Sequence, residues 1–268
     1  MEPARRPPPR ARPAAGRRPR PPSGPAQHPD PAVNAPARES ATDIIDVWSI
    51  PTDQPPAVVR RLYGLLDAEE RERADRARDP RQGERFTVVR GAVRLLVAER
   101  LDVAPADLAW RRGPHGRPSP AAGGRIDANW SASGALALLA VADGRRVGAD
   151  VEQLRPPGVG SRIARRHFPP ADAALVLDAP TPADGADRFT RLWCRREACV
   201  KVYGGRLAQG LGLPLAGPSP LRLADPGPLG PGPLRLADVP VPGPFRAAVA
   251  VDEDRPFTVR HRTWAAPS

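Results

Sequence analysis

Two strand-like runs joined by Asp143-Gly144 constrain the fold of this chain more than any other feature. The runs are ALALLAVA (135–142) and RRVGADVE (145–152), and Asp-Gly is a preferred sequence for a two-residue hairpin turn. Apolar residues recur at helical spacing before them (84–101), and two alternating, strand-like segments close the chain (245–253 and 257–264). The chain shows no strand–helix–strand rhythm and no glycine-rich phosphate loop, so the sequence predicts an α+β fold that contains this hairpin.

Other local signals place further elements around the predicted hairpin. Asp67 is in position to cap a helix, with Glu70 completing a capping box, and Gly204-Gly205 end a long later helix. A loop is predicted over residues 113–133. The Pro/Gly-rich stretch 214–244 contains LRLAD twice, and we interpret these copies as strands in a poorly ordered excursion.

Prolines concentrate in the N-terminal segment, where residues 1–40 hold 12 of the 38 prolines together with eight arginines. Such a segment cannot bury enough apolar surface to offset its ordering entropy, so we predict a disordered tail over residues 1–42. Two halves of a folded body are then expected, over residues 43–150 and 151–264. The tail carries +5 of the chain's net charge of +11. It is either a solvated extension or a segment that touches nucleic acid or a membrane.

The chain shows no signal-peptide pattern, and its longest apolar run is too short to cross a bilayer. We therefore expect a soluble, cytoplasmic protein without a membrane partner.

Lys201 is the only lysine among the 41 lysine and arginine residues. Lysine carries a compact charge and can lose its proton in a suitable environment, whereas arginine is a planar fork that stays charged. Trp193, Glu197 and Lys201 recur every four residues and so form one stripe of the predicted helix. The stripe is either an aromatic anchor with an ordinary ion pair, or part of a site that needs an ammonium group.

Asp150 and Glu152 lie two residues apart on a predicted strand, so their side chains share one face. Paired carboxylates of this kind suit Mg²⁺, which favours oxygen ligands and often shares them with phosphates. A solvated strand end is the alternative interpretation. Gly148, inside the same strand, indicates the close approach of a ligand or of another backbone.

Four motifs in order resemble those of the 4′-phosphopantetheinyl transferases of the surfactin-synthetase-activating type. They are GRP (116–118), ANWSAS (128–133), VGADVE (147–152) and WCRREACVK (193–201), and the match covers roughly residues 44–262. The family patterns are Gly-Lys-Pro, Phe-Asn-x-Ser-His-Ser, Val-Gly-Ile-Asp-x-Glu and Trp-x-x-Lys-Glu-Ser-x-x-Lys. This chain departs from them at Ala132, where the family has histidine, and at Arg117 and Arg196, where it has lysine. Outside these four motifs, HFPPAD (167–172) resembles the family's Phe-Phe-x-x-x-Glu and has Asp172 where a glutamate is usual.

The resemblance implies a monomeric pseudo-dimer of two similar α/β halves, with the active site in the cleft between them. It implies transfer of phosphopantetheine from coenzyme A to a serine of an apo acyl or peptidyl carrier protein, with release of adenosine 3′,5′-bisphosphate. Mg²⁺ would be held by Asp150, Glu152 and Glu197, and Glu197 would also take the serine proton. Lys201 would bind the pyrophosphate and protonate the leaving phosphate. The other implied coenzyme A contacts are Arg117 and Ser131, with Arg73, Arg85 and Arg90 near the 3′-phosphate and adenine.

Two rival hypotheses remain: a homologue that binds carrier proteins without catalysis because Ala132 replaces the histidine, and a basic-tailed nucleic-acid-binding protein. For the enzyme, we expect Lys201→Arg to lose most activity and Arg196→Lys to keep it, since any cation would serve at Arg195 and Arg196.

Overall fold

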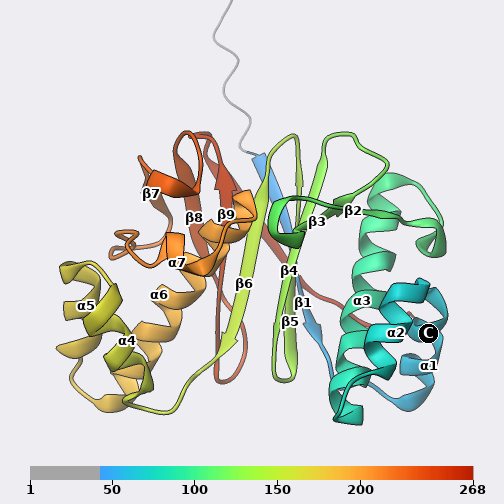
Figure 1. The fold of residues 1–268 in the computed structure, drawn as a ribbon, viewed down its shortest axis with the longest axis horizontal. Helices are drawn as coiled ribbons and strands as arrows, with labels where there is room; N and C mark the ends of the chain where they lie inside the picture. Colours follow the sequence, from blue (N-terminus) through green and yellow to red (C-terminus); the bar gives the residue numbers. More distant parts are fainter. Residues whose placement is uncertain (1–42, 268) are drawn as a thin grey trace, which may run out of the picture. The chain divides into compact units, whose positions relative to one another are not determined.

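The computed structural model describes residues 43–267, which form two four-stranded sheets with helices beside them (Figure 1). The first sheet has the order β10-β1-β5-β4, and only the β1–β10 pair is parallel. Its strands are β1 (Asp43–Pro51), β4 (Ile126–Ser133), β5 (Leu136–Asp143) and β10 (Phe257–Thr263). The helices beside it are α1 (Pro56–Leu65), α2 (Ala68–Asp75) and α3 (Pro80–Leu101). A small ribbon, β2 (Trp110–Arg112) with β3 (Pro118–Pro120), precedes β4.

The second sheet is antiparallel and has the order β6-β9-β8-β7. Its strands are β6 (Val147–Gln153), β7 (Leu221–Leu223), β8 (Leu234–Val239) and β9 (Phe245–Asp252). Its helices are α4 (Val159–His167), α5 (Pro170–Leu177), α6 (Pro182–Tyr203) and the short α7 (Leu207–Gly210). Strands β4 and β6 lie side by side between the two sets of helices (Figure 1). This mixture of helices and largely antiparallel strands confirms the α+β prediction.

Local signals in the sequence account for several element ends. Asp67 accepts a hydrogen bond from the Glu70 amide, and the Glu70 carboxylate accepts one from the Asp67 amide, so the predicted capping box is confirmed. Helix α6 ends at Gly204, whose φ of 67° is the left-handed conformation that glycine adopts easily. Within residues 43–267, no helix combines the length and the apolar composition needed to span a membrane. The predicted tail, residues 1–42, lies outside the described part of the chain.

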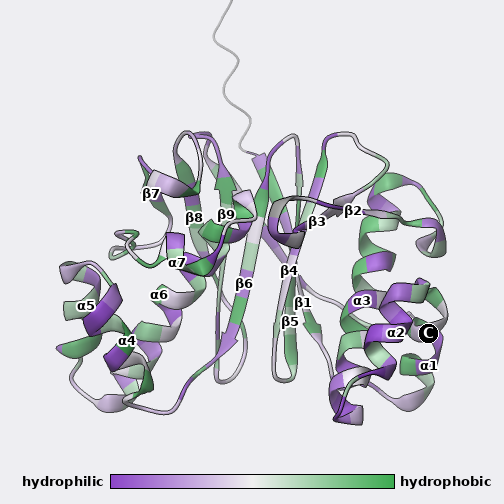
Figure 2. Cartoon of the chain, in the orientation of Figure 1, coloured by the Kyte–Doolittle hydropathy of each residue, from purple (hydrophilic) through white to green (hydrophobic). Residues whose placement is uncertain are grey.

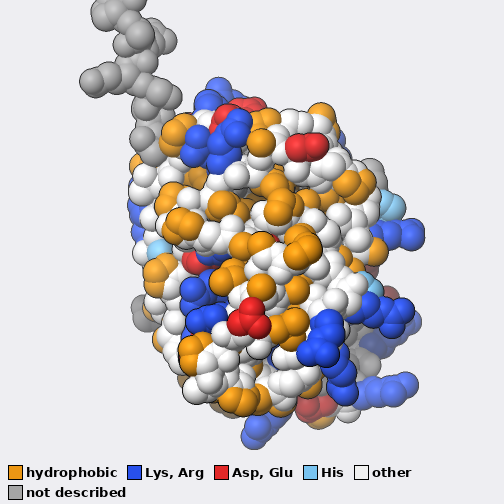
Figure 3. Space-filling view, turned by 90° about the vertical axis from the view of Figure 1, so that its left-hand side faces the viewer, with side chains coloured by type: hydrophobic (Ala, Val, Ile, Leu, Met, Phe, Trp, Pro, Cys, Tyr) orange, Lys and Arg blue, Asp and Glu red, His pale blue; other side chains and the backbone are white. Residues whose placement is uncertain are grey.

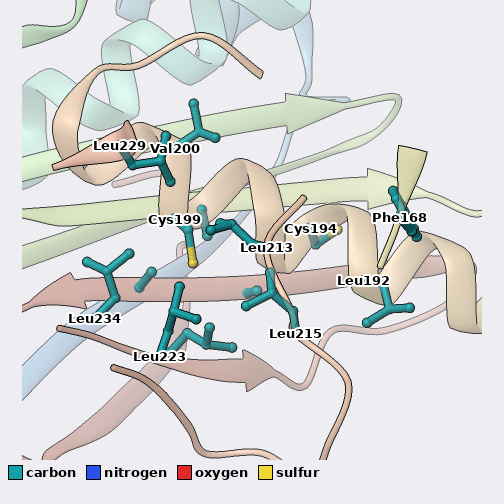
Figure 4. Close-up of a cluster of buried hydrophobic side chains, with 14 of the residues drawn as sticks. Phe168, Leu192, Cys194, Cys199, Val200, Leu213, Leu215, Leu223, Leu229 and Leu234 are labelled. Carbon is teal, nitrogen blue, oxygen red and sulfur yellow. The ribbon is translucent and has the colours of Figure 1, made fainter. Parts of the chain in front are cut away.

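Hydrophobic residues are frequent along the central strands, and the helices mix hydrophobic with hydrophilic residues (Figure 2). Strand β5 is buried from Leu136 to Ala142. Helix α6 packs on the second sheet through a cluster that includes both cysteines (Figure 4). On the side that carries α4 and α5, apolar side chains gather across the middle of the surface and Lys and Arg along one edge (Figure 3).

The predicted hairpin at Asp143-Gly144 is wrong. Strand β5 pairs with β1 and β4, whereas β6 pairs with β9 in the other sheet. Strand β6 instead forms an antiparallel ladder of seven residue pairs with β9. Arg145, in the link between β5 and β6, is buried and donates hydrogen bonds to the carbonyl oxygens of Asp252, Glu253 and Arg255. These bonds satisfy its buried N–H groups and tie the link to the end of β9.

Residues 126–133 of the predicted loop form strand β4. The two LRLAD copies were predicted as strands, and β7 and β8 confirm this. The expected poor order is wrong, because β8 is an internal strand in which Leu234 and Leu236 are fully buried. The expected boundary between residues 150 and 151 lies within β6. Strand β10, expected in the C-terminal half, belongs to the first sheet. Burial of alternate leucines against α6 orders the Pro/Gly-rich segment despite its composition.

Candidate active site

Side chains of alternate residues in β4 connect the two sheets by bonding to β6. Asp127 Oδ2 accepts a hydrogen bond from the Val147 amide (2.8 Å), and Asn129 Oδ1 accepts one from the Ala149 amide (2.9 Å). Ser133 Oγ accepts one from the Gln153 amide (3.1 Å). These polar side chains stand in for the backbone ladder that would join two strands of one sheet. Sequence reasoning missed Asp127 and Asn129, although every second residue of IDANWSAS is polar.

Helix α6 lies directly against β6 at Gly148. A Cβ atom at this position would meet the Ala198 carbonyl oxygen at 2.0 Å and the Val202 amide nitrogen at 2.7 Å. Gly148 was predicted to allow the close approach of a ligand or of another backbone, and the structure shows the second, the backbone of α6. The contact brings the turn of α6 that carries Glu197 and Lys201 over Asp150.

Lys201 is bound to Asp150 and Ser131. Its Nζ lies 2.6 Å from Asp150 Oδ1 and donates to Ser131 Oγ at 3.0 Å. Ser131 Oγ in turn donates to Asp150 Oδ1 at 2.8 Å. The lysine side chain is 27% exposed while the aspartate is buried, so a solvated strand end does not describe Asp150.

Glu152 and Glu197 complete a crowded group of carboxylates. Burial raises the pKa of Glu152, as does the charge of Asp150, while Ser133 Oγ donates to Glu152 Oε2 at 3.0 Å. Burial also raises the pKa of Glu197, which nearby Lys201 partly offsets. Within residues 43–267, Glu197 makes no hydrogen bond or ion pair. A cation other than Lys201 would relieve this concentration of negative charge.

The donor set fits Mg²⁺ in its chemistry. All three candidate side chains supply hard carboxylate oxygens, and Asp150 Oδ2 is buried with no hydrogen-bond partner. A buried polar atom without a partner is costly, so it indicates a missing ligand. Among the described residues, no three His, Cys, Asp or Glu side chains are already grouped as a metal site.

Arg155 is a second cation that sequence reasoning missed. Its guanidinium lies 3.9 Å from Glu152 and is placed over the Trp193 ring at 5.2 Å from the ring centre. Trp193 also packs on Phe189 and is therefore the aromatic anchor of the helix stripe. No sequence pattern marked Arg155, because its neighbours come together only through the packing of α6 on β6.

The arginines predicted near the 3′-phosphate do not meet the Lys201 group in this structure. Arg90 is buried, pairs with Glu70 and lies over the rings of Trp110 and Trp130, which also contact each other. Arg85 pairs with Asp53 at 2.8 Å, and exposed Arg73 lies over the Phe86 ring. Their phosphate-binding role stays a prediction. Arg117 already donates four hydrogen bonds inside the chain.

The inference that any cation would serve at Arg195 and Arg196 is wrong. Arg196 is fully buried, pairs with Asp172 at 2.5 Å, and donates to the carbonyl oxygens of Leu192, Leu211 and Leu213. Arg195 is buried and forms a two-pronged pair with Asp238. Both positions use the planar fork that lysine lacks.

Comparisons with known proteins identify a family whose match covers this part of the chain. The family model of the 4′-phosphopantetheinyl transferase superfamily matches residues 146–225, which include Asp150, Glu152, Glu197 and Lys201. The 4′-phosphopantetheinyl transferase HetI of Nostoc sp. is 32% identical over 171 residues, covering 63% of this chain and 72% of HetI. The protein slr0495 of Synechocystis sp., provisionally named a 4′-phosphopantetheinyl transferase, is 29% identical over 167 residues, covering 62% of this chain and 67% of its own length. The 4′-phosphopantetheinyl transferase AcpT of Salmonella typhimurium is 32% identical over 112 residues, covering 42% and 58%.

The chain therefore belongs to the 4′-phosphopantetheinyl transferase superfamily. Within that class it is an enzyme, a 4′-phosphopantetheinyl transferase, as the motif resemblance implied. The surfactin-synthetase-activating subtype stays a prediction.

Proposed function

We propose that this enzyme moves 4′-phosphopantetheine from coenzyme A to a serine of an apo acyl or peptidyl carrier protein, with Mg²⁺ as cofactor. The observation that carries the proposal is the Lys201–Asp150–Ser131 cluster, in which one buried oxygen of Asp150 has no partner. The cluster offers a point charge for a pyrophosphate next to oxygen ligands for a metal.

Asp150, Glu152 and Glu197 are the residues that would hold Mg²⁺. When bound, the ion would supply Lewis-acid chemistry and orient the pyrophosphate of the donor. The raised pKa values of Glu152 and Glu197 support this assignment, because carboxylates that repel one another gain from a shared cation.

The side chains of the chain divide the proton transfers between them. Glu197, whose side chain has no partner among residues 43–267, accepts the proton of the carrier serine as the serine oxygen bonds to the phosphorus nearer to pantetheine. The bond from that phosphorus to the bridging oxygen breaks, and Lys201 donates a proton to the released bisphosphate. Ser131 holds the lysine and contacts the donor through its hydroxyl. Arg73, Arg85 and Arg90 are proposed to face the 3′-phosphate and adenine.

The arrangement of the elements supports the expected pseudo-dimer. Each sheet has four strands and its own helices, and the cluster lies where β4 of one sheet meets β6 of the other. We propose that these are the two related halves, that the donor and carrier meet at their junction, and that the enzyme acts as a cytoplasmic monomer.

Intact-mass spectrometry tests the proposal directly. The protein is mixed with coenzyme A, Mg²⁺ and several apo carrier proteins, and a mass gain of one phosphopantetheine is expected. Asp150→Asn and chelation of the metal should each abolish the gain, whereas Asp143→Asn, an exposed carboxylate at the end of β5, should not. No transfer to any carrier, or full transfer by Asp150→Asn, would refute the proposal.

A further inference from the structure

Arg117 binds other parts of the chain, whereas the sequence resemblance implies that it binds a phosphate of coenzyme A. Its side chain, just before β3, is only 14% exposed. The guanidinium donates to Asp127 Oδ1 (3.0 Å) and Oδ2 (2.6 Å), to the Val147 carbonyl oxygen (2.8 Å) and to the Lys201 carbonyl oxygen (2.8 Å). Arginine has five N–H donors, so a single donor on Nη1 is left for any other ligand.

The acceptors of Arg117 belong to three different elements. Asp127 lies on β4, Val147 begins β6, and Lys201 lies in the last turn of α6. Asp127 Oδ2 also accepts from the Val147 amide, so the carboxylate and the guanidinium together bind both backbone groups of Val147. The Arg117–Asp127 pair therefore joins the two sheets and the end of α6 at a single point.

The contact with the Lys201 carbonyl fixes the end of α6. Carbonyl groups in the last turn of a helix lack hydrogen bonds from N–H groups of a following turn. A cation beside them is also attracted by the negative end of the helix dipole. Among the described residues, the only other hydrogen bond to this oxygen comes from the Gly204 amide at 3.3 Å. The Nε contact at 2.8 Å therefore holds the residue whose ammonium reaches Asp150 and Ser131.

We propose that Arg117 is a positioning residue that sets the location of the Lys201 ammonium, and that it is not a ligand of a donor phosphate. The inference rests on the proposed role of Lys201 in the transfer. A planar guanidinium can pair with a carboxylate through two parallel bonds and still reach two carbonyl groups. A lysine ammonium, whose donors radiate from one atom, cannot span these acceptors, so arginine at this position changes the function of the turn.

Nuclear magnetic resonance tests the positioning without any turnover. Because Lys201 is the only lysine, protein labelled with ¹³C-lysine gives a single Hε–Cε signal. We expect Arg117→Ala and Asp127→Ala each to displace or broaden this signal. Arg125→Ala removes an exposed arginine–aspartate pair on the neighbouring loop and should leave it in place. If the alanine variants do not fold, Asp127→Asn keeps an oxygen for the Val147 amide and removes the charge that binds Arg117.

Kinetics with coenzyme A and its 3′-dephospho analogue separate positioning from phosphate binding. A positioning role predicts that Arg117→Ala and Asp127→Ala each lower kcat about 100-fold with both donors and leave KM nearly unchanged. In the double variant, the losses of kcat should not add, because the two residues act as one pair. Arg117→Lys should not restore the rate.

An unmoved Lys201 signal in Arg117→Ala would overturn the inference. So would a rise in KM for coenzyme A alone together with normal activity of Asp127→Ala. Absence of transfer by the wild-type protein would count against the proposed function, and the resonance experiment would still decide the role of Arg117.

Discussion

Replacing Gly148 with alanine tests whether the contact between β6 and α6 holds the site together. The added Cβ would lie 2.0 Å from the Ala198 carbonyl oxygen and 2.7 Å from the Val202 amide nitrogen. Both atoms belong to the backbone of α6, so neither can turn aside as a flexible side chain would. Bringing the shorter contact to 3.0 Å requires helix and strand to separate by about 1 Å in a closely packed interior.

This separation should reduce both stability and activity. Overpacking typically costs about 1–3 kcal/mol, and a clash with two backbone atoms of α6 puts the loss of unfolding free energy in Gly148→Ala at about 3 kcal/mol. The same displacement moves Glu197 and Lys201 away from Asp150, and a misplacement of about 1 Å can slow a reaction about 100-fold. Urea unfolding followed by circular dichroism gives the first quantity, and single-turnover transfer to an apo carrier protein gives the second.

Gly64→Ala is the matched control. Gly64 lies in α1 with no atom within 4 Å of an added Cβ, so alanine should stabilise the protein by about 0.5–1 kcal/mol and leave transfer unchanged. If Gly148→Ala keeps wild-type stability and rate, the packing of α6 on β6 does not position the site and our reasoning is wrong.

Three further predictions follow from the charged residues. Lys201→Arg should lower the transfer rate about 100- to 1000-fold, because a guanidinium cannot donate the proton that the leaving phosphate needs; steady-state kinetics showing normal rates would contradict this. Arg196→Lys should lower the unfolding free energy by about 2–4 kcal/mol, since an ammonium cannot keep four hydrogen bonds in a buried site, whereas Arg76→Lys, in an exposed pair with Glu72, should leave it almost unchanged. Burial raises the pKa of Asp46, but Arg260, Arg100 and Arg262 outweigh burial and hold this pKa below the ordinary value of 3.8. The ionised Asp46 therefore stabilises the fold above pH 3.8, and this stabilisation is lost as the pH falls below 3.8. Asp46→Asn should flatten the acid limb of the pH–stability curve, measured as unfolding free energy against pH.

The lone lysine was a useful guide to the candidate site. Its rarity singled out Lys201, and the structure places its ammonium between Asp150 and Ser131. Composition was misleading for Arg195 and Arg196, because it does not reveal which cations are buried and which bind through two parallel hydrogen bonds.

Strand β4 shows why part of the candidate site was not predicted. Strand rules look for one apolar face and one solvated face, but the polar residues of β4, such as Asp127 and Asn129, face β6 instead of water. Only the neighbouring strand makes this alternation meaningful, and Asp127 was therefore overlooked together with its bond to Arg117.

The sequence by itself determined the features that depend on near neighbours. These are the capping box at Asp67, the end of α6 at Gly204, the shared face of Asp150 and Glu152, and the four-residue spacing of Glu197 and Lys201. Each follows from the geometry of one helix or one strand, which a few adjacent residues fix.

Tertiary structure alone decided which strands pair and which side chains meet. Asp-Gly favours a hairpin locally, yet β6 pairs along its length with β9 instead of β5. The buried Arg145 guanidinium, in the link between β5 and β6, bonds to carbonyl groups more than 100 residues away. Arg117 likewise bonds to Lys201 across 84 residues of sequence. Such contacts depend on the burial of polar groups in the assembled fold, where each donor must find an acceptor, and no local pattern encodes that requirement.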